Sequence, residues 1–454
     1  MTYTPHTTGT GTGTARGRGS AEDGPGRPAP RRLPIPPAVA VAELDLRAAD
    51  GAVLSLRPAP GGPPVGEGAV FALVRIDGHP VATVTGQVAA GQDPAEALTA
   101  AFRARSGATA TPSSPSPSTD PSLPPPRTTA VVATRERAGQ LARALDSLLA
   151  QDHPDFRVLV VDNAPVTTAT RDLVTSRYAG RVAYAHEPRP GLAVAHNRGI
   201  AAADRAAPVL AFTDDDVIAD PHWLSALTAP FAADPRLGCT TGLILPARLT
   251  TPAQILLESH GGFAKGVVPR LYDPAAPPAD QPLFPFTAGS FGSGANMAFR
   301  ADALRAVGGF DPATGTGTPA KGGDDLYAFV RVLAAGHRLR YTPEALVWHH
   351  HRETWQDLRN QAYGYGAGLT AYLTAILVRH PALLPALLAK VPRGLAHARA
   401  ITAHGTQAYP WPRSLSRLER RGMLYGPFGY AKARIRARAG AAGGLRDTAP
   451  GGTP

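Results

Sequence analysis

From residue 128 onward, the sequence alternates between short apolar segments and segments with helical periodicity. "TTAVVAT" (128–134), "FRVLVVDN" (156–163) and "PVLAFT" (208–213) are almost continuously apolar, as strands buried on both faces are. Helical patterns lie between them, in "GQLARALDSLLAQ" (139–151) and "GLAVAHNRGIAAAD" (191–204). This alternation predicts an α/β fold with a mostly parallel sheet and helices on both faces. Such sheets bind ligands at the carboxyl ends of their strands.

Polar residues stand at the ends of these predicted strands, in the groups Thr134 to Arg137, Asp162 with Asn163, and Asp214 to Asp216. A carboxylate such as Asp162 accepts hydrogen bonds from a nucleobase imide or a ribose hydroxyl. Three adjacent aspartates repel one another, and Mg²⁺ or Mn²⁺ would neutralise them while also binding diphosphate oxygens. The structural alternatives are an Asx turn at Asp162 and a helix cap at Asp214 to Asp216.

Composition divides the rest of the chain. The predicted parts are a disordered tail (1–36), a small β-rich α+β module (37–107), a Pro/Ser linker (108–127), the α/β domain (128–352), a basic helical region (353–440) and a second disordered tail (441–454). The N-terminus lacks the apolar segment of a secretory signal, and Cys239 is the single cysteine. We therefore expect a cytoplasmic protein.

The positive charge is concentrated at the C-terminal end. Residues 352–454 contain 15 Lys or Arg and four Asp or Glu, a difference that equals the net charge of +11 for the whole chain. The neighbouring apolar stretch 368–392 is interrupted at Arg379, His380 and Pro381, so each piece is shorter than a membrane-spanning helix. Contact with an anionic membrane surface and ordinary helix packing both fit this pattern. Nucleic acid fits less well, because aromatic and basic residues do not interleave.

Several motifs occur together in one order: "VVATRERAGQLARALDSLLAQ", "RVLVVDNAP", "GLAVAHNRGIAAA", "LAFTDDDVIADPHWL", "GSGANMAFRADALRAVGGFDP" and "GGDDLYAFVRVLAAGHRLRYTPEALVWHHHR". Over about residues 128–352, the set resembles family 2 glycosyltransferases of GT-A fold. The resemblance implies transfer of a sugar from a nucleoside diphosphate donor, with Mg²⁺ or Mn²⁺ as the cofactor. The implied acceptor carries a hydroxyl group, on a glycan, a lipid or a small molecule.

The resemblance also implies roles for the strand-end residues. Asp214 and Asp216 match the family's Asp-x-Asp element, which holds the metal and the donor diphosphate, and Asp215 would lie near the ribose or the sugar. The other residues that we assign to substrate binding are Thr134, Arg137, Asp162, Asn197, Asn296 and Asp324. Of these, Asn296 belongs to a segment that resembles the family's acceptor-side loop. In "AHNRG" the family often has Arg where this chain has His196.

Two later motifs complete the expected site. In "GGDDLYAFV", Asp325 matches the acid that removes a proton from the acceptor hydroxyl, while Asp324 replaces the family's usual Glu. The structural alternative is that both acids stabilise a helix N-terminus, by about 0.3–1 kcal/mol each. In "VWHHHR", His349 is the histidine expected to approach the metal or the diphosphate. Adjacent side chains on a strand point to opposite faces, so the three histidines are not expected to bind one ion.

The expected reaction is a direct displacement with inversion, because the motifs supply no second nucleophile for a covalent sugar intermediate. Three alternatives remain. A nucleotidyltransferase also uses metal-bound aspartates, but the chain lacks the Gly-x-x-x-x-Gly-Lys-Ser/Thr phosphate loop. A metal hydrolase could use the Asp and His clusters. A non-catalytic relic could bind sugar nucleotides or glycans, although Asp162, Asp214, Asp216 and Asp325 are all in place.

Overall fold

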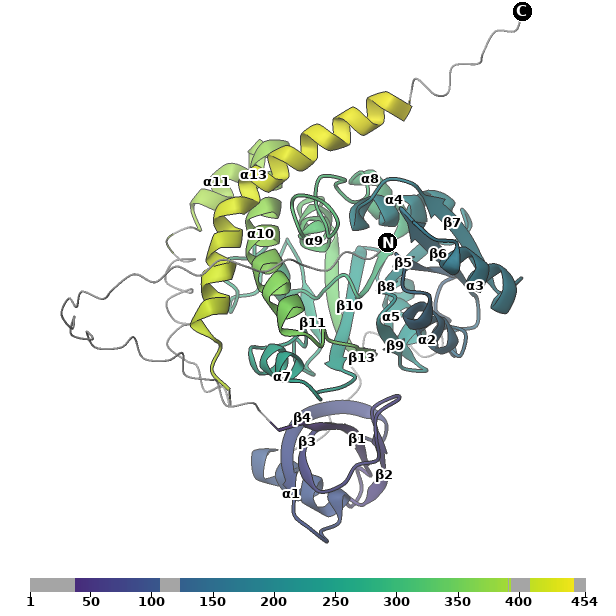
Figure 1. Cartoon of the computed structure of the whole chain (residues 1–454), viewed down its shortest axis with the longest axis vertical. Coiled ribbons are helices and arrows are strands. Elements are labelled where there is room, and N and C mark those ends of the chain that lie inside the picture. Colours follow the sequence, from purple (N-terminus) through teal and green to yellow (C-terminus); the bar gives the residue numbers. More distant parts are fainter. Residues whose placement is uncertain (1–36, 107–122, 391, 393–408, 445–454) are drawn as a thin grey trace, which may run out of the picture. The chain divides into compact units, whose positions relative to one another are not determined.

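The computed structural model describes residues 37–106, 123–390, 392 and 409–444 (Figure 1). The tail predicted at 1–36, most of the predicted linker and the end of the second tail lie outside the described residues, and the domain boundaries stay predictions. The first four strands along the chain form one sheet, in the order β2-β1-β3-β4. They are β1 (Ala40–Leu46), β2 (Val53–Pro58), β3 (Gly68–Ile76) and β4 (His79–Val88). Helix α1 (Pro94–Ser106) buries Leu98 and Phe102 against it.

The main sheet has nine strands in the order β11-β13-β10-β12-β8-β5-β6-β7, with β9 paired to β13. Its strands are β5 (Thr128–Thr134), β6 (Phe156–Asn163), β7 (Val182–Glu187), β8 (Val209–Asp214), β9 (Val217–Ala219), β10 (Leu237–Pro246), β11 (Arg270–Tyr272), β12 (Asn296–Arg300) and β13 (Arg338–His349). Its helices are α2 (Ala138–Leu148), α3 (Ala169–Arg177), α4 (Leu192–Ala202), α5 (Trp223–Thr228), α6 (Pro230–Ala233), α7 (Pro252–Ser259), α8 (Ala301–Ala306) and α9 (Asp324–Ala334). The α/β class is confirmed.

Strand direction varies across this sheet. Strands β7, β6, β5 and β8 pair in parallel, as do β10 and β13, whereas β9, β11 and β12 pair antiparallel with their neighbours. Parallel neighbours need a crossover connection, which α2, α3 and α4 supply between β5 and β8. The antiparallel strand β12 does not follow a crossover helix of this kind. A short 3₁₀ turn (Ala288–Ser290) and irregular chain precede it. The sequence pattern therefore predicted β5, β6 and β8 of the parallel half, but neither β7 nor the antiparallel strands.

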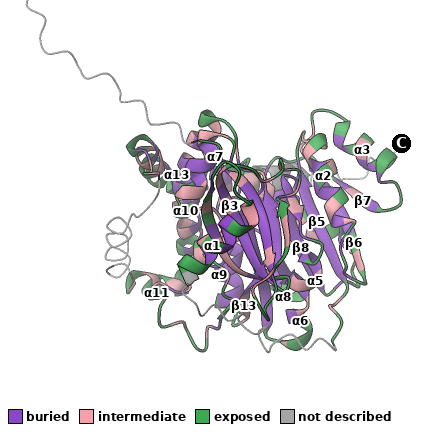
Figure 2. Cartoon of the chain, turned by 90° about the horizontal axis from the view of Figure 1, so that it is seen from below, coloured by how far each residue is buried: buried purple, intermediate pink, exposed green. Residues whose placement is uncertain are grey.

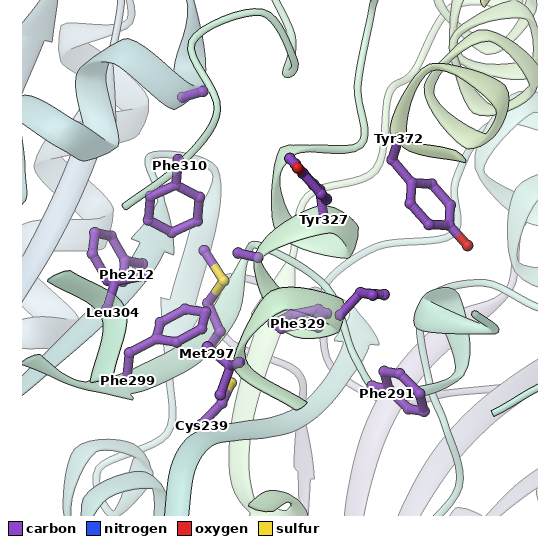
Figure 3. Packing of buried hydrophobic residues seen from close by; sticks show 14 of the residues in the cluster. Phe212, Cys239, Phe291, Met297, Phe299, Leu304, Phe310, Tyr327, Phe329 and Tyr372 are labelled. Atoms are coloured by element: carbon purple, nitrogen blue, oxygen red, sulfur yellow. The ribbon is translucent and has the colours of Figure 1, made fainter. Parts of the chain in front are cut away.

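Helices cover both faces of the sheet, because alternate residues of its strands point to opposite sides. Leu210 and Phe212 of β8 join a cluster with α4 and α9, while Val209 and Ala211 join one with α2 and α5. In Figure 2 the strands are mostly buried, and exposed residues appear on the outer sides of the helices. Figure 3 shows the first cluster, in which Phe212, Phe299 and Phe310 meet edge to face. Each fully buried Phe contributes about 1.5–3 kcal/mol.

Two long helices follow the sheet, α10 (Trp355–Arg379) and α13 (Arg413–Gly444), with the short α11 (Leu384–Leu388) between them. Glycines line the contact between α10 and α13. A side chain at Gly366 would collide with the backbone of Glu419, and one at Gly422 with the backbone of Tyr363. The close approach buries one face of α10, which also contacts α9.

No single helix in the described part of the chain is long and apolar enough to cross a membrane. One pair of segments, Trp355–Arg379 with Pro381–Leu388, meets the criteria of length and composition together, but it is bent by 108°.

Candidate active site

The predicted strand-end residues lie along one edge of the sheet. Thr134 at the end of β5 is opposite Asp162 at the end of β6, and Ala133 is opposite Asp214 at the end of β8. The turn after β8 then carries Asp215 and Asp216. The parallel register between neighbouring strands explains this arrangement, because it places their carboxyl ends side by side.

Two arginines and one hydroxyl offset the charge of the aspartates. The Thr134 hydroxyl donates to Asp215 Oδ2 at 2.6 Å, and Arg137 Nη1 lies 3.0 Å from Asp215 Oδ1 and 3.3 Å from Asp216 Oδ2. Arg352 Nη2 approaches Asp216 Oδ2 at 3.5 Å. The sequence reasoning assigned Arg137 to substrate binding and did not assign Arg352, although Arg352 directly follows the three histidines.

The three aspartates differ in their pKa. Burial and the charge of Asp216 raise the pKa of Asp214 to about 7. Burial also raises the pKa of Asp215, although Arg137 opposes this shift. For Asp216, burial alone would raise the pKa, but His349, Arg352 and Arg137 outweigh it and hold the pKa below its usual range. The cluster therefore contains one carboxyl that is readily protonated beside one that stays ionised, and a cation at Asp214 would favour its ionised form.

The three histidines separate as the strand geometry predicts. His349 Nε2 lies 3.4 Å from Asp216 Oδ1, while His350 uses its backbone N–H to bond the Asp216 carbonyl. His351 contacts His349 through their Nδ1 atoms at 2.9 Å and bonds Glu258 Oε2 at 3.0 Å through Nε2. This chain of contacts orients the His349 ring toward Asp216. Because Glu258 is 93 residues away in the sequence, its role was not visible there.

The residues at this edge could supply only some of the ligands of a hard divalent cation. Asp216 Oδ1 is buried and makes no hydrogen bond among the described residues, and its neighbour at 3.4 Å, His349 Nε2, could bind the same cation. His349 Nε2 and the Asp214 carboxyl are the further candidate donors. No group of three His, Cys, Asp or Glu side chains in the described ranges is arranged to hold a metal by itself. Mg²⁺ and Mn²⁺ commonly complete such partial sites with substrate phosphates and water.

Asp325 lies at the start of α9 and lines the same cleft as the aspartates. Gly294 N–H donates to its Oδ2 and Leu326 N–H to its Oδ1, both at 2.8 Å. Burial and the charge of Asp324 raise the pKa of Asp325 to about 6, against the opposing effect of these two hydrogen bonds. A carboxylate with a pKa near neutrality is suited to accept a proton from a hydroxyl.

Two of the predicted substrate-binding residues, Asn197 and Asn296, make hydrogen bonds within the protein. Asn197 Nδ2 donates to the Phe310 carbonyl and its Oδ1 accepts from Phe310 N–H, so its amide holds a loop and does not line the cleft. Asn296 Nδ2 donates to the Leu243 and Ala345 carbonyls, and its Oδ1 accepts from Trp223 Nε1. In this structure both amides therefore make packing contacts, while the predicted substrate contact stays a prediction.

Asp162 is fully buried at the end of β6. Its Oδ2 accepts from the Tyr184 hydroxyl at 2.9 Å, and its Oδ1 has no hydrogen-bond partner among the described residues. The neighbouring Asn163 lines the cleft, whereas Asp162 does not. Contact between Asp162 and a nucleobase would therefore require local movement.

The cleft has a volume of about 1200 Å³ and is larger than the aspartate edge alone. Helix α10 forms one wall with polar and aromatic side chains that the sequence reasoning did not assign, namely Gln356, Arg359, Asn360, Gln361, Tyr363 and Tyr365. Lys265, Lys321 and Asp324 also line it. The aspartates, Asp325 and the α10 wall thus share one cavity, which is large enough for a nucleotide sugar together with a second substrate.

Comparison with known proteins adds an independent finding. A family model described as "Glycosyltransferase like family 2" matches residues 125–363. A pre-mycofactocin glycosyltransferase of Mycobacterium tuberculosis (strain CDC 1551 / Oshkosh) is 30% identical over 260 residues, covering 56% of this chain and 48% of that protein. A validoxylamine A glucosyltransferase of Streptomyces hygroscopicus subsp. jinggangensis is 36% identical over 125 residues, covering 26% and 29% respectively.

These alignments span about half the length, or less, of the curated relatives. Among solved structures, a mannosyltransferase from Pyrobaculum calidifontis in complex with GDP-Man and Mn²⁺ aligns at 18% identity and a TM-score of 0.42. That alignment covers 70% of this chain and 88% of the other.

Proposed function

This chain belongs to glycosyltransferase-like family 2, and we propose that it transfers a sugar from a nucleoside diphosphate donor to a hydroxyl acceptor with inversion at the anomeric carbon. Membership confirms the predicted family and, together with the observed α/β architecture, the predicted GT-A class. The observation that carries the proposal is the position of Asp325, which lines the same cleft as Asp214, Asp215 and Asp216.

The donor diphosphate binds at the carboxyl ends of β5 and β8. Arg137 and Arg352 bring positive charge to this edge, where the diphosphate gains negative charge as the sugar departs. Preorganised cations of this kind stabilise the developing charge more effectively than water does. Thr134 keeps the Asp215 carboxylate in place through its hydrogen bond.

Asp325 acts on the acceptor as the general base. The acceptor oxygen forms a bond to the anomeric carbon while the bond from that carbon to the diphosphate oxygen breaks. The hydroxyl proton passes to the Asp325 carboxylate, and the leaving nucleoside diphosphate takes the electron pair of the broken bond. The Gly294 and Leu326 N–H groups hold the carboxylate in one orientation. Because attack comes from the side opposite the leaving group, the sugar configuration inverts.

Asp214, Asp216 and His349 are the residues that would hold Mg²⁺ or Mn²⁺. When bound there, the cation would neutralise part of the diphosphate charge. Asp216 Oδ1 makes no hydrogen bond among the described residues and has His349 Nε2 beside it, and the pKa of Asp214 is raised; a cation would relieve both unfavourable features, which supports this assignment.

A thermal-shift screen with UDP-, GDP- and dTDP-sugars, each with and without Mn²⁺, tests the donor and the metal together. We expect one donor class to raise the melting temperature, and to do so more strongly with Mn²⁺, because ligands that bind only the folded state stabilise it. NMR of the product formed from that donor then reports the anomeric configuration. Retention of configuration would contradict the direct displacement, and full turnover in excess EDTA would contradict the metal site.

A further inference from the structure

Helix α13 has two contrasting faces. One face packs closely on α10 through Gly422 and Gly426, whose added side chains would meet Tyr363 and Thr370. The other face carries three large apolar residues that are mostly exposed: Leu424 (85%), Phe428 (64%) and Ile435 (70%). In a regular helix of 3.6 residues per turn these three positions fall within about 40° of one another around the axis, and Pro427 lies inside the helix between the first two. They therefore form a single apolar stripe that no described part of the chain covers.

Basic residues flank this stripe on both sides. We call the stripe and these basic residues together the α13 outer face. The basic residues are Arg417, Arg420, Arg421, Lys432 and Arg438, which are exposed, and Arg434, which is half-exposed. Glu419 is the only acidic residue between positions 413 and 444, and it lies on the packed side, against Gly366. The α13 outer face therefore combines exposed apolar area with positive charge that no carboxylate of its own helix offsets.

A cavity of about 300 Å³ adjoins this face between α13 and the chain near Asp311. Its charged lining consists of Asp311, Arg379, Arg434 and Arg438. Asp311 is already neutralised, since Arg379 Nε lies 3.1 Å from its Oδ2 and the Tyr430 hydroxyl donates to the same oxygen at 3.0 Å. Within the described residues, no carboxylate pairs with Arg434 or Arg438. The cavity thus presents two unpaired guanidinium groups, which suit a phosphate group.

We propose that the α13 outer face docks on an anionic lipid bilayer, with the apolar stripe in the interfacial region and a lipid phosphate between Arg434 and Arg438. A helix with an apolar stripe and basic flanks binds a membrane surface through both features. Each basic residue near an anionic bilayer strengthens the attraction, which salt weakens. A nucleic acid would use the same charges but would gain little from Leu424, Phe428 and Ile435. The inference is independent of the proposed glycosyl transfer.

Co-sedimentation of the full chain with vesicles tests this docking. The probes are phosphatidylcholine vesicles, mixed phosphatidylcholine and phosphatidylglycerol vesicles, and a double-stranded RNA of random sequence. One variant, Leu424→Glu with Phe428→Glu, removes the apolar contact. A second, Arg434→Glu with Arg438→Glu, removes the phosphate contact. The matched controls are Val166→Glu, at an exposed apolar residue (81%) in a loop before α3, and Arg198→Glu with Arg205→Glu, at exposed arginines distant in sequence from α13.

We expect the full chain to bind the anionic vesicles at low salt, with at least about 10-fold weaker binding in each α13 variant and no change in either control. Thermal melts of all variants check that the fold is retained, as expected for substitutions at positions that are exposed or, for Arg434, half-exposed. Equal binding to neutral and anionic vesicles, or equal binding by the variants and the controls, would overturn the proposal. Tighter binding to RNA than to anionic vesicles, unaffected by Leu424→Glu with Phe428→Glu, would assign the face to nucleic acid instead.

Discussion

His196 Nδ1 lies 3.6 Å from Asp324 Oδ2, and both side chains are almost completely buried. These are two positions at which the chain departs from the family pattern, which often has Arg and Glu there. The His196 ring is enclosed by Phe212 and Phe310, and neither of its nitrogens makes a hydrogen bond among the described residues. Asp324 precedes Asp325 directly, so the charge of this buried pair acts on the proposed base.

Asp324→Asn is expected to shift the pH dependence of activity. Burial is the largest cause of the raised pKa of Asp325, which is about 6, and the negative charge of Asp324 is the second. The base works in its ionised form, so activity of the native chain should fall as the pH drops through about 6. Removing the charge of Asp324 lowers the pKa of Asp325, and the acid limb of kcat/KM should move to lower pH.

A pH profile of kcat/KM from pH 4.5 to 8.5 measures this shift. Asp357→Asn is the matched control, because Asp357 also lines the cleft but is not among the causes of the raised pKa. If the acid limb of Asp324→Asn stays at the native pH, the charge of Asp324 does not affect the pKa of the base.

Asp325→Asn should lose most turnover while keeping donor affinity. General-base catalysis typically contributes about 10²- to 10⁴-fold, which sets the expected fall in kcat. Asn has nearly the same size but only one acceptor oxygen, so it keeps one of the two hydrogen bonds from Gly294 and Leu326, and the free energy of unfolding should fall by about 1 kcal/mol. A donor titration and a turnover assay on one preparation measure the donor affinity and kcat separately. Normal turnover, or an equal loss of donor binding, would favour a purely structural role at the N-terminus of α9.

Glu258→Gln should weaken metal binding without removing a proposed ligand. Glu258 holds His351, which contacts His349, and losing such an outer partner typically costs about 10- to 100-fold in metal affinity. Titration of Mn²⁺, followed by electron paramagnetic resonance in the absence of donor, measures the affinity directly. Glu344→Gln changes an exposed carboxylate of β13 that contacts His79, and it should leave the affinity unchanged. Equal Mn²⁺ affinity in the two variants would exclude a role for the His351–Glu258 contact.

Asn296→Ala should lower stability rather than donor affinity. The substitution leaves the Leu243 and Ala345 carbonyls and Trp223 Nε1 without their partner in a buried region. Each buried group left unpaired costs about 1–3 kcal/mol, so the free energy of unfolding should fall by about 3 kcal/mol or more. Denaturant unfolding measures the loss, and the donor KM of the folded fraction should stay within about twofold of the native value. A large rise in KM with unchanged stability would restore the substrate-contact role predicted from the sequence.

Local patterns in the sequence were enough to predict the strands that form the site. Strands β5 and β6 have the bounds expected from their apolar runs, because a strand buried on both faces must be apolar along its whole length. The polar residues at their ends then meet by the geometry of parallel pairing alone. Strand alternation also predicted that the three histidines would not act together, and His350 bonds the Asp216 carbonyl through its backbone N–H while the His349 ring contacts the Asp216 carboxylate.

Tertiary structure decided which of these polar groups face the cleft. The partners of Asn197 and Asn296 lie between 49 and 113 residues away, so only the folded chain shows what their amides bond. Arg352 likewise contacts Asp216 from a segment distant in sequence. Helix α10, which forms one wall of the cleft, is also distant in sequence from the aspartates. Periodicity and composition carry information about which residues are buried and where an element ends. The partner of a polar atom depends instead on the packing of whole elements, and that packing exists only in the folded protein.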